Sequence, residues 1–245
     1  MISKIKSLVE DYKVLLRNVP AFVTTVFVLT TVLMNFAAAR LLVNVGSFAV
    51  TGGFLLSFVP FLCMDCVTKR FGARAAIMLN ILSALGNLFA VVFLGIVAAI
   101  PTDSPDLEFK YIFGGVWFIC LSSTVAFVVS GVINSLLNAA IGKLFMKNPN
   151  GALAFSARSF ISTFVGQAID NFLFIAGVYV IFAPIYWGLE PISIIACLGT
   201  AVFGGLLELI LEVLFGWFGY KTCKRWEREK VGQEYVDLHS AKTTE

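Results

Sequence analysis

The chain consists of long apolar runs separated by short polar stretches, and six of these runs, the second of them short, are predicted to cross a bilayer as helices. We expect the six helices at residues 19–43, 54–68, 74–100, 112–138, 158–183 and 192–219. Residues 1–18 have apolar positions at helical spacing among basic residues, which is typical of a helix on the cytoplasmic membrane surface. A glycine-containing loop is expected at 44–53, and a polar, partly disordered cytoplasmic tail at 221–245. The pattern therefore predicts an all-α, polytopic membrane protein whose transmembrane domain covers residues 19–220.

The composition narrows the class of protein further. Of the 245 residues, 59% are hydrophobic and 13% are charged, whereas a soluble domain carries about 25% charged residues. The five cysteines lie in or beside apolar runs, which favours neither a disulfide framework nor a zinc site. The single histidine, His239, lies in the tail and cannot serve as a base within the membrane. We therefore expect no enzymatic activity, no metal and no cofactor.

The basic residues lie mostly on one side of the predicted bundle. With six spans and the N-terminus inside, only Arg40 and Lys110 fall toward the outside. The cytoplasmic set is Lys69, Arg70, Arg74, Lys143, Lys147, Arg158 and the cluster at 221–230. An excess of lysine and arginine in the cytoplasmic loops sets the orientation of membrane proteins. Both termini are therefore predicted to be cytoplasmic.

The fifth predicted helix carries a stripe of polar side chains. At 100° per residue, Thr163, Gln167 and Asp170 fall within one arc, whereas the opposite side of the helix is apolar. Asp170 lies about 20 Å from the cytoplasmic end at ~1.5 Å per residue, inside a hydrocarbon core of roughly 30 Å. A charged residue at that depth costs about 2.5–3.5 kcal/mol on insertion scales, and such residues often mark functional sites. The plainer alternative is a structural hydrogen bond between neighbouring helices.

Every predicted helix has its polar or small residues on one side. In lipid such faces must turn inward or line a wet cavity, so together they are expected to form a polar, amide-rich chamber that suits a neutral, hydrogen-bonding solute. The candidate substrate-binding residues are Asn35, Asn87, Asn134, Ser162, Thr163, Gln167, Asp170 and Asn171. The candidate gating or coupling residues are Arg40, Asp65, Lys69, Arg158, Glu208 and Glu212.

Asp65 and Lys69 form one specific hypothesis within the second set. Asp65 precedes Lys69 by one helical turn, which is the favourable order for an i,i+4 ion pair. Such a pair is expected either to open and close the inner end of the chamber or to be a plain ion pair at the end of a helix.

Two segments resemble the queuosine precursor transporter family, also called vitamin uptake transporters. Residues 64–72, MDCVTKRFG, are similar to the family's D-x-x-x-[charged]-x-x-G segment after the second span. Residues 158–174, RSFISTFVGQAIDNFLF, are similar to its R-x-x-x-S-T-x-x-x-Q-x-x-D-[ST]-x-x-F segment in the fifth span. The resemblance implies a bacterial inner-membrane importer of deazaguanine precursors or queuine that hydrolyses no ATP itself. Asn134, Asn171 and Glu208 depart from the family's usual residues, which leaves the identity of the solute open.

The resemblance suggests how such a solute would be recognised. A deazaguanine presents two adjacent N–H donors with a carbonyl group beside them, and one carboxylate can accept both donors in a bidentate, charge-assisted arrangement. Asp170 is therefore expected to bind the donor edge. Gln167 or an asparagine on another helix, Asn35, Asn87 or Asn134, is expected to bind the carbonyl group, with an aromatic side chain covering the ring.

Two other functions stay open as alternatives. A substrate-binding subunit of an energy-coupling-factor vitamin importer is also a small six-span protein, but it needs a separate ATPase module. An intramembrane protease could use Asp65 and Asp170, yet the flanking sequence does not suggest one. As partners we expect a nucleobase-like small molecule, the lipid bilayer and, as an option, a second copy of the chain in a homodimer; we expect no nucleic acid.

The charge asymmetry makes the predicted orientation testable by cysteine labelling. In a background without the five native cysteines, single cysteines at residues 101–110 should react with a membrane-impermeant reagent in intact cells, whereas those at 143–150 should react only after lysis. Reaction of both loops from the outside of intact cells would contradict the six-span arrangement.

Overall fold

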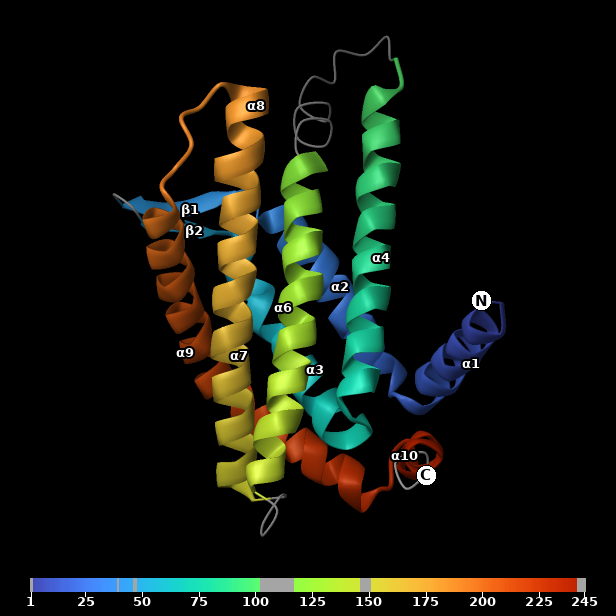
Figure 1. The fold of residues 1–245 in the computed structure, drawn as a ribbon. Coiled ribbons are helices and arrows are strands. Elements are labelled where there is room, and N and C mark those ends of the chain that lie inside the picture. The colour runs from blue at the N-terminus through green and yellow to red at the C-terminus, as the bar shows by residue number, and fades with distance from the viewer. Residues whose placement is uncertain (1, 39, 46–47, 102–116, 146–150, 242–245) are drawn as a thin grey trace.

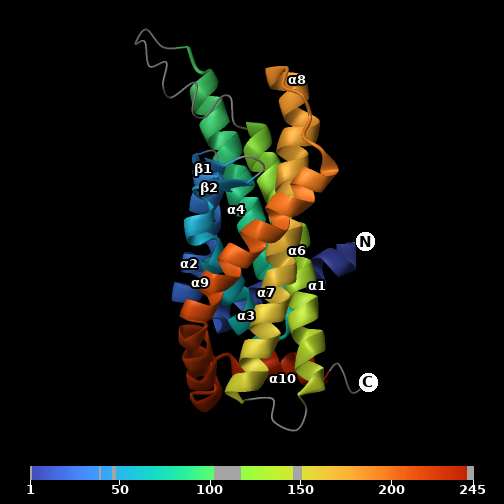
Figure 2. The ribbon, with the colours of Figure 1, turned by 90° about the vertical axis from the view of Figure 1, so that its left-hand side faces the viewer.

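The computed structural model describes residues 2–38, 40–45, 48–101, 117–145 and 151–241. The first half of the chain contains α1 (Ile2–Asn18), α2 (Ala21–Ala37), β1 (Leu41–Val45), β2 (Phe48–Thr51), α3 (Phe54–Phe71) and α4 (Ala73–Ala99). The second half contains α6 (Trp117–Leu144), α7 (Ala152–Ile175), the π-helix η2 (Ala176–Phe182), α8 (Ala183–Trp187), α9 (Ile194–Arg228) and α10 (Gln233–Ala241). The helices form a tall bundle in which α4, α6 and α7 run side by side (Figure 1), and α9 crosses α7 (Figure 2).

Four helices in the described part of the chain are long and apolar enough to cross a membrane, at residues 73–99, 117–144, 152–186 and 194–228. The pair α1 and α2, bent by 108°, would supply a fifth if it counted as one span. The 18 residues of α3 include three charged side chains, Asp65, Lys69 and Arg70, which lower the apolar character of that helix. The chain is therefore a polytopic membrane protein, and the count of six spans and the orientation of the termini stay predictions.

The first transmembrane helix is shorter than the hydropathy pattern predicts. α2 ends at Ala37 and not at residue 43, and Leu41–Val45 pairs antiparallel with Phe48–Thr51 as a hairpin. An apolar run rich in β-branched residues fits a strand as well as a helix, so periodicity alone could not separate the two. The prediction of a loop at 44–53 is wrong for the same reason, because most of that segment belongs to the hairpin.

The C-terminal segment is more regular than its polarity predicts. α9 continues past residue 220 to Arg228, and α10 follows and contacts α1. Glu234 at the start of α10 accepts hydrogen bonds from Asn18 Nδ2 at 3.0 Å and from Arg17 Nη2 at 2.5 Å. The hydrogen bond from Asn18, together with the nearby charge of Arg17, holds the pKa of Glu234 below its ordinary value. The expectation of disorder is therefore wrong for most of residues 221–241.

Glycines on α9 allow α7 to approach closely. A Cβ at Gly205 would lie 3.2 Å from the backbone nitrogen of Ala168, and one at Gly204 would lie 2.9 Å from Nδ2 of Asn171. Small residues at helix interfaces permit such close contact in membranes, where van der Waals packing and hydrogen bonds replace apolar burial as the force of association. This packing brings the polar stripes of α7 and α9 against each other.

The close approach predicts a strong effect of bulk at Gly205. Gly205→Leu should destabilise the protein by about 1–3 kcal/mol, because the added side chain meets the backbone of α7, which has no rotamer to change. Gly199→Leu on the same helix is the matched control, since a Cβ there meets nothing within 4 Å. Thermal unfolding of both purified variants in detergent compares them, and equal melting temperatures would contradict the close approach.

Candidate functional site

Asp65 is a fully buried carboxylate on α3 that collects hydrogen bonds from two other helices. Asn134 and Asn138 on α6 donate to Oδ1 from their Nδ2 atoms at 3.1 and 2.9 Å. On α7, Thr163 donates to Oδ2 at 3.2 Å, and Ser159 Oγ is hydrogen-bonded to the same oxygen. Each pair of partners is four residues apart, which places both members on one helical face. These bonds offset the cost of removing the carboxylate from water and tie α3 to α6 and α7.

Ser159 joins Asp65 to a second buried carboxyl group. Its Oγ lies 2.6 Å from Oε1 of Glu212 on α9. Glu212 is fully buried, and its Oε2 has no hydrogen-bond partner in the described part of the chain. No lysine, arginine or histidine of the described residues forms an ion pair with either carboxyl group. The hydroxyl group of Ser159 therefore links two acidic side chains that lack a paired cation.

Gln167 lies on the same stripe, one helical turn beyond Thr163. It is fully buried, yet neither Oε1 nor Nε2 has a hydrogen-bond partner among the described residues. Oδ1 of Asn134 on α6 is likewise buried without a partner. A buried polar atom left unsatisfied costs about 1–3 kcal/mol. A hydrogen-bonding solute or a water molecule that binds these two amides would therefore recover that free energy.

Asp170 lies further along the stripe of α7, beyond Gln167, and Glu208 lies on α9. Ser130 Oγ on α6 donates to Oδ1 of Asp170 at 2.8 Å, and Nδ2 of Asn171 donates to Oε2 of Glu208 at 3.0 Å. A cavity of about 50 Å³ lies beside Asn171 and Glu208. It has room for a few water molecules, whereas the pockets that hold organic ligands have volumes of about 300–1,000 Å³.

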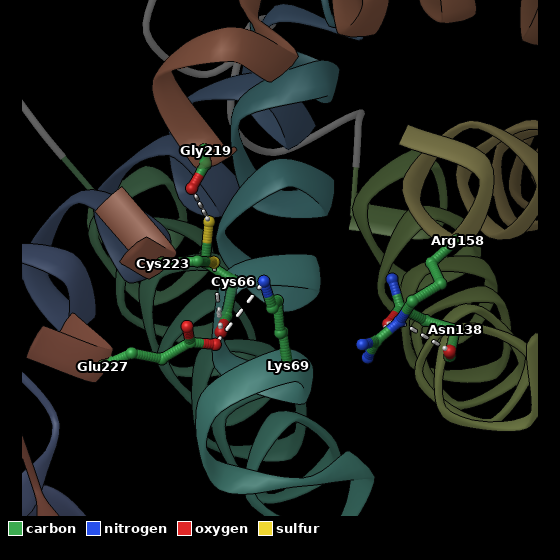
Figure 3. Close-up of polar contacts among 7 residues, drawn as sticks. All are labelled: Cys66, Lys69, Asn138, Arg158, Gly219, Cys223 and Glu227. Carbon is green, nitrogen blue, oxygen red and sulfur yellow. Dashed lines mark hydrogen bonds and ion pairs between the residues drawn. The ribbon is translucent and has the colours of Figure 1, made fainter. Parts of the chain in front are cut away.

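Lys69 pairs with Glu227 on α9, and not with Asp65 as its spacing predicts (Figure 3). Its Nζ lies 3.5 Å from Oε1 of Glu227, and 3% of the Lys69 side chain is exposed. The same nitrogen lies 5.6 Å from the ring centre of Phe155, within the range of a cation–π contact. Asp65 takes its hydrogen bonds from neutral side chains of α6 and α7. The predicted Asp65–Lys69 ion pair is therefore wrong, and the ion pair at this end joins α3 to α9.

The two arginines of the predicted coupling set lie in different surroundings. Arg158 Nη2 donates to Oδ1 of Asn138 at 2.9 Å, and its Nε lies 3.2 Å from the carbonyl oxygen of the same residue (Figure 3). It thus supports an amide that donates to Asp65. Arg40 is exposed beside the hairpin, and among the described residues it forms no ion pair with the buried carboxyl groups.

Two of the predicted substrate-binding asparagines contact α6. Asn35 Oδ1 accepts a hydrogen bond from Ser123, and Asn87 Nδ2 donates to Oγ1 of Thr124 at 2.6 Å. Neither asparagine is hydrogen-bonded to Asp170, whose partner in this structure is a serine of α6. These bonds hold α2 and α4 against α6.

Sequence reasoning left three contributors to the site unassigned. Ser159 and Asn138 lie on the predicted polar stripes, but their spacing in the sequence does not distinguish them from a neighbouring serine, Ser162. Ser162 makes only a long contact with the same carboxylate, since its Oγ lies 3.5 Å from Oδ1 of Asp65. The third, Glu227, falls in the segment predicted to be a tail. In the sequence, Glu227 is a carboxylate close to the end of an apolar run. This position indicates a partner for Lys69 only once α9 is known to be continuous.

Comparison with known families gives a match over more than half of the chain. Residues 51–222, from the end of β2 into α9, match a family described as "Putative vitamin uptake transporter". The matched segment includes Asp65, Gln167, Asp170, Glu208 and Glu212. No curated protein and no solved structure matches the chain.

The buried lysine predicts a measurable cost when its partner is removed. Glu227→Gln should destabilise the protein by about 1–3 kcal/mol, because it leaves the Lys69 ammonium group buried without a counter-charge. Glu229→Gln is the matched control. It removes an ion pair with Arg225, whose side chain is 70% exposed, and such exposed pairs contribute about 0.2–1 kcal/mol. Thermal unfolding in detergent compares the two, and a loss no larger for Glu227→Gln than for Glu229→Gln would contradict the buried pair.

Proposed function

The chain belongs to the vitamin uptake transporter family, and we propose that it imports queuosine precursors, either deazaguanine bases or queuine, across the bacterial inner membrane. The observation that carries the proposal is the buried, unpartnered amide of Gln167 between two clusters of carboxyl groups. An amide held in this way offers its N–H donors and its carbonyl acceptor to a planar, hydrogen-bonding solute. Phosphates and other anions would meet repulsion from Asp65 and from any other carboxyl group of the site that is ionised.

Asp170 is proposed to bind the donor edge of the solute. A carboxylate has about four acceptor positions, and Ser130 occupies one of them in this structure. Gln167 precedes Asp170 by one helical turn, so a ring that bonds to Asp170 can place its carbonyl group near the amide. Oδ1 of Asn134 can accept a further N–H of the solute.

The proposal includes six membrane-crossing helices with both termini cytoplasmic. α2 and α3 are not among the four helices that are each long and apolar enough to cross a membrane. Both pack against those helices or each other, α2 against α3 and α4, and α3 against α6 and α9. A bilayer that surrounds α4, α6, α7 and α9 would therefore surround α2 and α3 as well, and the basic-residue asymmetry supports the orientation.

Transport is testable with the purified chain. Reconstituted alone in liposomes, it should take up radiolabelled queuine, and unlabelled deazaguanine bases should compete with the label. The liposomes contain no ATPase, so uptake would support a self-sufficient transporter. Uptake that appears only when a separate ATPase module is added would contradict the proposal and would indicate a subunit of an energy-coupling-factor importer.

The recognition role of Asp170 predicts a large effect of a nearly isosteric change. Asp170→Asn presents an N–H donor to a donor of the solute, so queuine binding and uptake should weaken at least about tenfold, the equivalent of ~1.4 kcal/mol. Asp237→Asn makes the same chemical change on exposed α10 and should have no effect. Calorimetric titration with queuine measures the affinity. Unchanged affinity in Asp170→Asn would assign Asp170 a structural or coupling role instead.

A further inference from the structure

The hydroxyl group of Ser159 has one hydrogen but lies between two carboxyl groups. Its Oγ is hydrogen-bonded to Oδ2 of Asp65 and lies 2.6 Å from Oε1 of Glu212. One hydrogen satisfies one of these contacts, and an ionised carboxylate has no hydrogen to give to the other. With both carboxyl groups ionised, one oxygen pair would be left without a hydrogen, inside the membrane. A single proton on the pair removes this conflict.

The remaining contacts show which carboxyl group holds that proton. Asp65 accepts hydrogen bonds from Asn134, Asn138 and Thr163, so its oxygens are surrounded by donors. Glu212 has Ser159 as its partner, and its Oε2 has none among the described residues. A neutral Glu212 donates to Ser159, and Ser159 in turn donates to Asp65. Every contact then has its hydrogen, and only one negative charge stays buried.

The charged groups nearby do not replace the proton. Arg158 on α7 is the described cation whose charge acts on Asp65, yet its hydrogen bonds go to Asn138. Lys69 on α3 is paired with Glu227. The other titratable groups close to the pair are the thiols of Cys63 and Cys66 on α3, and α6 contributes neutral amides there. On α9, Glu208 precedes Glu212 by one turn and adds negative charge when it is ionised.

A cavity of about 500 Å³ lies at the end of the bundle at which α9 joins α10. Thr222, Arg225 and Glu229 on the last turns of α9 line it, and so does Cys63, two residues before Asp65 on α3. The cavity therefore extends from the polar end of α9 to the part of α3 next to Asp65, whereas Asp65, Ser159 and Glu212 themselves are buried outside its lining.

We propose that Glu212, Ser159 and Asp65 form a proton-binding site that couples transport to a proton gradient. The proton moves between a carboxyl oxygen of Glu212 and a water molecule that enters when the bundle opens, and no other covalent bond is made or broken. When the proton is bound, Ser159 joins α3, α7 and α9. When it is released, two carboxylates face one hydroxyl group, and α9 is repelled from α3. The role in coupling rests on the proposed transport function, whereas the proton site itself does not.

The proton can be observed without any solute by infrared spectroscopy of the purified full chain. The wild type should show the carbonyl band of a protonated carboxyl group that disappears as pH rises. Glu212→Gln should lose one component of this band, Ser159→Ala should shift its frequency, and Ser159→Thr, which keeps the hydroxyl group, should restore it. Glu208→Gln is the matched control on the same helix and should keep the component. A Glu212→Gln spectrum equal to that of the wild type at every pH would overturn the proton site.

Transport separates coupling from solute recognition. In liposomes with an imposed pH gradient, Glu212→Gln should lower gradient-driven accumulation of radiolabelled queuine at least about tenfold more than it lowers queuine counterflow without a gradient. Equal losses in the two assays would overturn the coupling role. If the wild type shows neither accumulation nor counterflow, queuine is the wrong solute, and the infrared result alone decides whether the proton site exists.

Discussion

A carboxylate inside a membrane protein must find its hydrogen-bond donors within the protein, and this constraint organises the structure around Asp65. Donors from α6 and α7 converge on its two oxygens, so a single side chain of α3 fixes the positions of two neighbouring helices. Ser159 extends the same network to Glu212 and thus to α9. The apolar faces of the helices can contact lipid as well as one another, so the polar network determines which faces meet.

Glycine and hydrogen bonding act together in that network. A Cβ at Gly166 would lie 3.1 Å from Cβ of Asn134 and 2.8 Å from the ring of Phe61, so α7 can approach α6 and α3 only because this position has no side chain. Gly205 does the same between α7 and α9. Short amide and hydroxyl side chains reach their partners at these distances, and longer helix separations would leave them unsatisfied.

The sequence predicted the structure correctly where a single physical rule determines it. The apolar run at 74–100 corresponds to α4 (Ala73–Ala99), and the polar stripe of the fifth helix does face other helices, because lipid excludes it. Prediction failed where two structures satisfy the same rule. Leu41–Val45 is as apolar as the end of a membrane helix, but it forms a strand. Lys69 has the right spacing for an ion pair with Asp65, but it pairs across the bundle with Glu227. Which partner a side chain takes depends on helix rotation, and a single sequence does not contain that information.

The buried polar side chains differ in how many hydrogen-bond partners they have, and this difference indicates where the bundle can open. Asp65 is surrounded by donors, whereas Gln167 has no partner among the described residues, and the small cavity by Glu208 has room for only a few water molecules. A purine-sized ring therefore fits beside Gln167 only if α7 moves relative to α6 or α9. α7 is joined to α9 by the bonds of Ser159 with Glu212 and of Asn171 with Glu208. It is joined to α6 by more bonds, because Asp170 bonds to Ser130, and both Arg158 and Ser162 bond to Asn138. Because fewer bonds cost less to break, the α7–α9 interface is the side on which the bundle separates with least loss.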